Sequence, residues 1–150
     1  MEENQYRDTY HSLNPLRCVF EKSINSRRCN CSLSQRFNLA DREGVRCTME
    51  LAQKRCQTLL ETLRNNAIFT MRLTRIDGAL PHGKEIKVQT GGLLGLQALL
   101  EAGHDEHAGI EDIYKLINQA IEKYSSMDGF PYDEIVKQIA RFEGRNKRAR

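Results

Sequence analysis

The sequence predicts a mostly helical α+β fold, with a cysteine-rich N-terminal half, a small β-hairpin and a C-terminal helical hairpin. Apolar residues recur at the spacing of one helix face over 48–66, 109–125 and 132–144. Residues 68–76 instead alternate apolar and polar side chains, which is the period of a half-buried strand. All five cysteines of the 150-residue chain lie between positions 18 and 56. The helix and strand periods indicate the fold class, and the cysteines are the one anomaly of composition.

The N-terminal residues predict an arm followed by a short helix. Residues 1–14 are polar and have no apolar period, so we expect an arm there. Asn14 before Pro15 is typical of a helix start, and the apolar spacing after it predicts a helix over 15–26. Residues 27–34 contain Asn and Ser, whose side chains compete for backbone hydrogen bonds, and we expect them to be irregular.

The middle of the chain is predicted to contain a helix and then a hairpin. Gly44 marks the end of a short helical turn, and Thr48 caps a longer helix that runs to about residue 66. Turn residues separate the strand at 68–76 from a return strand at 85–90. Because a hairpin of two strands is marginal alone, we expect helices or a partner to cover it.

The C-terminal part is predicted to be helical throughout. Gly91 opens a short apolar helix that ends at Gly103, and helices over 109–125 and 132–144 form an antiparallel hairpin. The resulting division of the chain has three parts: an N-terminal arm at 1–14, a cysteine-rich metal-binding region with helix and β-hairpin at 15–104, and a C-terminal helical hairpin with a basic tail at 105–150.

The charges are distributed unevenly. The formal net charge is +3, but residues 15–64 carry ten Lys or Arg against five Asp or Glu, whereas residues 105–143 carry nine acids against four bases. Opposite charge on the two halves predicts either an internal fit or two different partner surfaces. The tail after residue 144 is basic again.

The sequence predicts a cytoplasmic protein. No segment approaches the roughly 20 apolar residues that a membrane span needs, and the polar N-terminus has no apolar run typical of a secretion signal. In a reducing cytosol structural disulfides are rare, so clustered cysteines point to metal or redox chemistry. The alternative without metal chemistry is that the five thiols are unrelated core side chains.

A thiolate metal centre is the leading interpretation of the cysteines. Soft metals need three or four thiolates at one point, preferably near positive charge, and five arginines surround the cysteines: Arg27, Arg28, Arg36, Arg42 and Arg46. All five cysteines are candidate metal ligands: Cys18, Cys29, Cys31, Cys47 and Cys56. The first choices are Cys29, Cys31 and Cys47, with Cys18 or Cys56 as the fourth ligand.

The position of the helix start decides whether Cys47 and Cys56 can share one centre. On a single unbroken helix these two residues would lie on opposite faces, roughly 13 Å apart along the axis. Cys56 also belongs to the stripe that contains Leu59 and Leu63, where a core role is equally consistent with the pattern. A helix that begins later, near Leu51, would let the preceding loop curl back and bring both thiols together.

The identity of the metal is weakly specified. There is no C-x2-C pair and no nearby histidine to complete a zinc finger. An iron–sulfur cluster is placed slightly ahead of zinc, because the arginines would offset the negative charge of a cluster. No catalytic residue is predicted, since no thiol–imidazole pair has a third group that could orient it.

Two further motifs are assigned no chemistry. The run His104-Asp105-Glu106-His107 could bind zinc or iron, but its spacing does not aim both imidazoles together, and a solvated helix entry is favoured. The glycines of 90–95 lack the spacing and the Lys-Ser/Thr ending of a phosphate loop, so close packing is favoured for them.

Three functions follow from these observations. The first is a small cytoplasmic iron–sulfur or metal-binding accessory or electron-transfer subunit of a larger protein complex. The second is a zinc-stabilised regulator that binds nucleic acid through the arginines at 27, 28, 36 and 42 and the basic tail. The third is a purely structural protein-interaction module, for which replacing Cys29 and Cys31 would change nothing.

Overall fold

The protein is mostly helical with one small antiparallel hairpin, as the predicted fold class has it, but this hairpin lies at 34–47 and does not involve the strands predicted at 68–76 and 85–90. A computed structural model describes residues 2–68, 80–101 and 109–143, and within them there are six α-helices and two strands. In chain order the elements are α1 (Glu3–Leu13), α2 (Glu21–Asn25), β1 (Ser34–Leu39), β2 (Arg42–Cys47), α3 (Glu50–Asn66), α4 (His82–Leu100), α5 (Ile113–Tyr124), a 3-10 turn η2 (Met127–Gly129) and α6 (Tyr132–Arg141).

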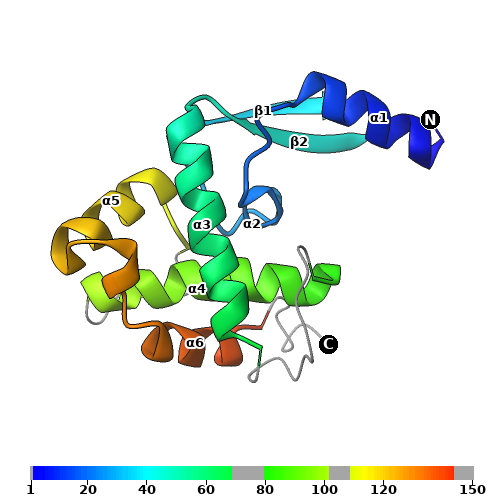
Figure 1. The fold of residues 1–150 in the computed structure, drawn as a ribbon. Coiled ribbons are helices and arrows are strands. Elements are labelled where there is room, and N and C mark those ends of the chain that lie inside the picture. Colours follow the sequence, from blue (N-terminus) through cyan, green and yellow to red (C-terminus); the bar gives the residue numbers. More distant parts are fainter. Residues whose placement is uncertain (1, 69–79, 102–108, 144–150) are drawn as a thin grey trace.

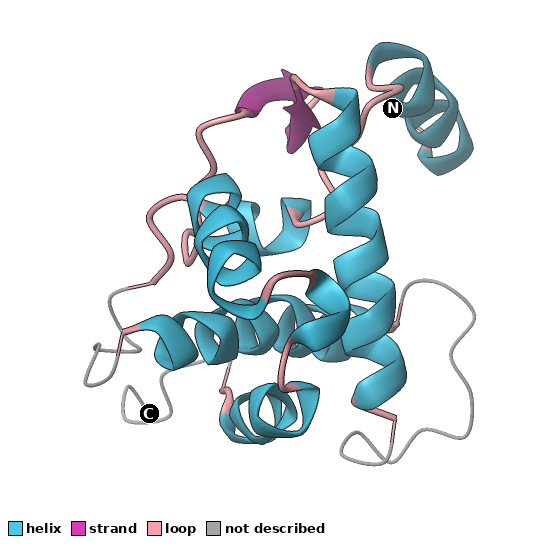
Figure 2. Cartoon of the chain, turned by 60° about the vertical axis from the view of Figure 1, so that its left-hand side comes forward, coloured by secondary structure: helices cyan, strands magenta, loops and turns pink. Residues whose placement is uncertain are grey.

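The helices gather around α4. This helix contacts α2, α3, α5 and α6, and its residues from Val88 to Gln97 are all buried. α3 crosses it and continues to the hairpin, which lies with α1 at the far end of α3 from α6 (Figure 1). A second view shows the same separation between the strands and the helices around α4 (Figure 2). The molecule therefore consists of a helical body and a smaller layer formed by α1 and the hairpin.

Glycines in α4 allow α6 to approach its backbone closely. A Cβ atom at Gly91 would lie 2.8 Å from the Cα atom of Ile139, and one at Gly95 would lie 3.1 Å from the Cα atom of Ile135. α4 and α6 form the most extensive contact between two helices of the body. The glycines thus serve close packing, as the sequence predicted, but of one helix against another.

Gly91→Ala is expected to destabilise the protein, because the added methyl group meets backbone that cannot move without shifting α6. We expect the free energy of unfolding to fall by roughly 1–3 kcal/mol, the usual cost of overpacking. Gly83 is the matched control, because no atom lies within 4 Å of a Cβ built there. Gly83→Ala should leave stability unchanged or raise it by up to about 1 kcal/mol. Urea unfolding curves measure both; equal midpoints would contradict the packing role.

The hairpin pairs Ser34 with Cys47 at one end and Leu39 with Arg42 at the other. Phe37 lies opposite Gly44, and its ring covers the space that a side chain at Gly44 would fill. The other edge of β2 receives the segment before α2, because the Cys18 N–H donates to the Val45 carbonyl at 3.0 Å and Arg17 bridges to Arg46. A third short extended segment therefore joins the two strands.

Several predicted elements were wrong. Residues 85–90 are part of α4, not a strand; this helix is buried on nearly all sides, so apolar residues do not mark a single face. The N-terminal segment predicted as an arm forms α1, and Gly44 lies in β2 rather than at the end of a helical turn. Most of the strand predicted at 68–76 lies outside the described residues.

The remaining helices lie close to their predicted residue ranges, but one of them packs against a different helix than predicted. α3, α5 and α6 match their predicted ranges to within a few residues, and α2 covers part of the helix predicted at 15–26. α6, however, packs mainly on α4 and not on α5, so the C-terminal helices do not form the expected hairpin. The division of the chain into an arm, a metal-binding region and a C-terminal part stays a prediction.

Candidate metal centre

Four of the five cysteines line one pocket between the hairpin and the helical body. They come from four separate segments: Cys18 precedes α2, Cys31 precedes β1, Cys47 ends β2 and Cys56 lies in the second turn of α3. The rest of the lining is mainly apolar and consists of Val19, Phe20, Leu33, Ser34, Ala52, Gln53, Ile113 and Tyr114. The tertiary structure thus brings together thiols up to 38 residues apart in the chain.

The four thiols are mutual electrostatic neighbours. Burial, with smaller contributions from Cys56, Cys31 and Cys47, raises the pKa of Cys18 to about 12. Burial likewise raises the pKa of Cys56 to about 12, with Cys31 and Cys47 adding to the effect. The pKa of Cys31 is raised by burial and, in smaller part, by Cys47. Every pair among the four is therefore close enough to interact, and burial disfavours the thiolate forms of Cys18, Cys31 and Cys56.

Neighbouring backbone lowers the pKa of two of the thiols. The backbone of Phe20 lowers the pKa of Cys18 against the effect of burial. The backbone of Leu33 and of Tyr114 does the same for Cys31. Hydrogen bonds from backbone to sulfur favour a thiolate over a thiol, and they are one of the features that tune iron–sulfur centres. The pocket is therefore equipped to hold thiolates once a metal displaces their protons.

Two helix N-termini border the pocket. α3 begins at Glu50 and α5 at Ile113, and residues of the first turn of each helix line the pocket. The N-terminus of a helix carries partial positive charge, which stabilises an anion nearby. A thiolate-bound centre is negatively charged, so both helices would stabilise it.

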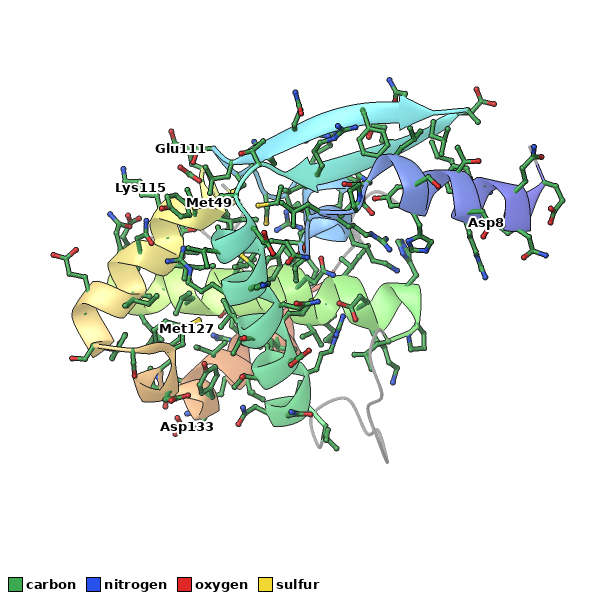
Figure 3. The ribbon with its side chains drawn as sticks, turned by 45° about the horizontal axis from the view of Figure 1, so that its top comes forward. Asp8, Met49, Glu111, Lys115, Met127 and Asp133 are labelled. Carbon is green, nitrogen blue, oxygen red and sulfur yellow. The ribbon has the colours of Figure 1, made fainter. Side chains whose placement is uncertain are left out.

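The helix boundary explains how Cys47 and Cys56 meet. α3 starts at Glu50, three residues after Cys47, which therefore belongs to β2 and not to the helix. The Cys47 thiol donates to the Met49 carbonyl at 3.3 Å, so the chain turns sharply between strand and helix. This is the arrangement that the sequence analysis required for both residues to share a centre. Figure 3 shows Met49 at the start of α3.

An arginine precedes three of the four pocket cysteines, at positions 17, 46 and 55. Arg55 lowers the pKa of Cys56 against burial. Its guanidinium stacks over the Tyr114 ring at 5.1 Å, and its Nε and Nη2 atoms are buried with no hydrogen-bond partner among the described residues. The repeated Arg-Cys dipeptide was a signal for Arg17 and Arg55 that the sequence analysis did not use.

Cys29 lies outside the pocket. It is 1% exposed, belongs to the hydrophobic core, and pairs through its backbone with Ile110. Burial raises the pKa of its thiol to about 12, against the lowering effects of Arg28, the Ser23 side chain and the Ile110 backbone. The sequence analysis ranked Cys29 among the first choices, whereas the structure places Cys18 and Cys56 both in the pocket without it.

The dimensions of the pocket bear on what it could hold. The void measures about 20 Å³, somewhat more than the roughly 10–15 Å³ that a single water molecule requires. Within residues 2–68, 80–101 and 109–143, no three Cys, His, Asp or Glu side chains are arranged to hold one metal ion directly. The thiols therefore surround a space without closing on a single point.

The other sequence motifs contribute nothing to this site. The run from His104 to His107 lies outside the described residues, and the glycines of 90–95 lie within α4. No helix in the described part of the chain is long and apolar enough to cross a membrane.

The chain was also compared with known proteins. No protein-family model, curated protein or solved structure matches it. The proposals below therefore rest on the residues of this chain alone.

Proposed function

We propose that this protein is a small cytoplasmic iron–sulfur protein that serves as an accessory or electron-transfer subunit of a larger complex. Cys18, Cys31, Cys47 and Cys56 would be the cluster ligands. The observation that carries the proposal is the convergence of these four thiols, from four separate segments, on one mainly apolar pocket. Unrelated core cysteines have no reason to meet in this way, and four thiolates are the usual ligand set of iron–sulfur clusters.

The ligand set suits both a cluster and a single zinc ion. A zinc ion draws four sulfur atoms to about 2.3 Å from one point, so the thiols would have to move inwards, because among the described residues no three ligand side chains are arranged for that. A cluster places several iron and sulfide atoms between the ligands, so the thiols would have to move outwards, because the void measures only about 20 Å³. The preference for a cluster therefore rests on the charges around the pocket. When bound, a cluster would supply one-electron exchange.

The charges around the pocket support the same proposal. Negative charge at the thiols is favoured by Arg55, by the N-termini of α3 and α5, and by the backbone of Phe20, Leu33 and Tyr114. A cluster held by four thiolates carries net negative charge, which these groups would offset. The acidic C-terminal region and basic N-terminal region of the sequence would provide contact surfaces for other subunits.

The proposal is tested by metal and sulfide analysis of protein purified without oxygen, together with its visible absorption spectrum. We expect iron and acid-labile sulfide bound to the chain and a broad absorption band that disappears when the protein is reduced. Zinc alone, in stoichiometric amount, would show a single-ion structural site and rule out electron transfer. A colourless protein that binds neither iron nor zinc would contradict the proposal entirely.

The nucleic-acid alternative is less well supported. Of the arginines named for it, Arg27 and Arg36 pair with Glu43, and Arg42 forms two hydrogen bonds with Glu3. Guanidinium groups held by carboxylates in this way are less available to phosphates. Steep loss of nucleic-acid binding as salt rises would revive this alternative.

A further inference from the structure

We infer that the metal centre cross-links two layers of the protein. Metal loading would then control whether the outer layer is attached to the helical body. The outer layer, here called the cap, comprises α1, residues 14–18 and the hairpin at 34–47. The inference rests on the proposed function only in that it needs a metal or cluster bound by the four thiols.

The four ligands are divided equally between the two layers. Cys18 and Cys47 belong to the cap, where the Cys47 N–H donates to the Leu16 carbonyl at 2.8 Å next to the link between Cys18 and Val45. Cys31 and Cys56 belong to the helical body. A centre bound by all four thiols therefore joins cap and body by two bonds on each side.

The loop that carries Cys31 is fixed to the body without any metal. The Asn30 N–H donates to the Ile110 carbonyl at 2.9 Å, and the Ile113 N–H donates to the Asn30 carbonyl at 2.8 Å. The Ser32 N–H donates to the Asp112 carboxylate at 2.9 Å. Cys31 is thus tied to the start of α5, and Cys56 is fixed by its place in α3.

The cap, in contrast, has little core of its own. Tyr10 and Val45 are its only buried apolar side chains among the described residues, and its other side chains are mainly exposed or half-buried. A strand pair of this size is not stable in water unless something covers one face. The cap therefore depends on its attachment to the body.

Apart from the thiols, that attachment combines one apolar contact, Val45 in the main hydrophobic core, with several polar contacts. The buried carboxylate of Glu21 in α2 accepts from the Tyr10 hydroxyl, from the Val45 N–H at 2.6 Å and from Arg17 at 2.8 Å. Glu43 of the hairpin pairs with Arg27 at an exposed position, where an ion pair contributes little. The binding free energy of the metal would add directly to these contacts, because binding and attachment are linked.

Release of the cap would uncover the apolar walls of the pocket. Val19, Ala52 and Ile113 line it between the two layers. Loss of the metal would therefore both detach the cap and expose a surface of the body. This makes the metal state a switch for the shape of the molecule, separate from any electron transfer.

The test is amide hydrogen exchange measured by mass spectrometry on the full chain, before and after anaerobic loading with iron and sulfide. Without metal, peptides covering 34–47 and 3–13 should exchange at least about tenfold faster than in the loaded protein, because local opening governs their exchange. Peptides from the middle of α4 and from α5 should exchange equally in both states. Cys47→Ala should behave as the unloaded protein, and Cys29→Ala as the wild type.

The outcomes separate this inference from the proposed function. If the protein takes up iron and sulfide but the hairpin exchanges at the same rate in both states, the inferred cross-link between cap and body is wrong and the cluster proposal stands. If no metal is taken up, both fail. If every peptide exchanges faster without metal, the centre stabilises the whole fold, and the division into cap and body is overturned.

Discussion

Replacing any one of the four pocket cysteines by alanine is expected to lower the iron content of the loaded protein at least about tenfold, since loss of even an outer-sphere partner weakens metal binding by 10–100-fold. Alanine is chosen because a serine oxygen can still bind iron. The four variants test ligands from separate segments, so a shared loss would identify one centre: Cys18→Ala, Cys31→Ala, Cys47→Ala and Cys56→Ala.

Cys29→Ala is the matched control for this series. Cys29 is more deeply buried than the four, but it lies outside the pocket. We expect it to keep its iron and sulfide, with only a small loss of stability. Circular dichroism at 222 nm checks that each variant remains helical. Iron loss in Cys29→Ala equal to that in Cys56→Ala, with both proteins folded, would show that the pocket is not the site.

Arg64→Met is expected to destabilise the protein by about 3–5 kcal/mol at neutral pH, the usual cost of leaving one charge of a buried pair alone. Glu85 in α4 is 1% exposed, and its two oxygens accept from the Arg64 guanidinium at 3.0 Å each. It also accepts from the Leu80 N–H and from Gln89. Methionine keeps much of the volume of arginine but cannot pair with the carboxylate.

The effect of Arg64→Met should depend on pH in a defined direction. Burial raises the pKa of Glu85, but hydrogen bonds from Arg64, the Leu80 N–H and Gln89 outweigh it, so the pKa lies below its ordinary value. The pair therefore stabilises the wild type above the unfolded pKa of about 4.3, and this stability is lost as pH falls through the lower folded pKa. Since the variant instead buries an unpaired charge at neutral pH, its deficit should shrink on acidification.

Urea unfolding of both proteins at neutral pH and near pH 4 measures this prediction. Lys54→Met is the control, because Lys54 pairs with Glu50 on an exposed face of α3, where such pairs are worth less than about 1 kcal/mol. A deficit for Arg64→Met that is as small as that of the control, or that grows on acidification, would contradict the role assigned to the buried pair.

The sequence alone predicted the helices that have one buried face and one exposed face. α3, α5 and α6 each place apolar residues on one side and polar residues on the other, so their periodicity indicates the helix. The concentration of cysteines also indicated which part of the chain contains the candidate metal centre. These properties are local, because each depends on neighbours within one or two turns.

The hairpin could not be found from local signals. Its two-residue turn is Ala40-Asp41, in which Ala40 has φ 56°, whereas the usual signal for such a turn is Asn-Gly or Asp-Gly. Its strands bury few side chains, so they show no clean alternation. Conversely, α4 is buried on almost every side, so its apolar residues do not mark one face. The apolar residues of 85–90 alternate as in a strand and led to the wrong prediction there.

The sequence by itself determined that this chain is mostly helical and that its thiols are gathered in one region. Only the tertiary structure decided which four thiols meet. That choice depends on α3 starting after Cys47, on Cys29 being drawn into the core beside Ile110, and on β2 carrying Cys47 back to Cys18. The last two are contacts between residues distant in the chain, and spacing along the sequence does not specify such contacts.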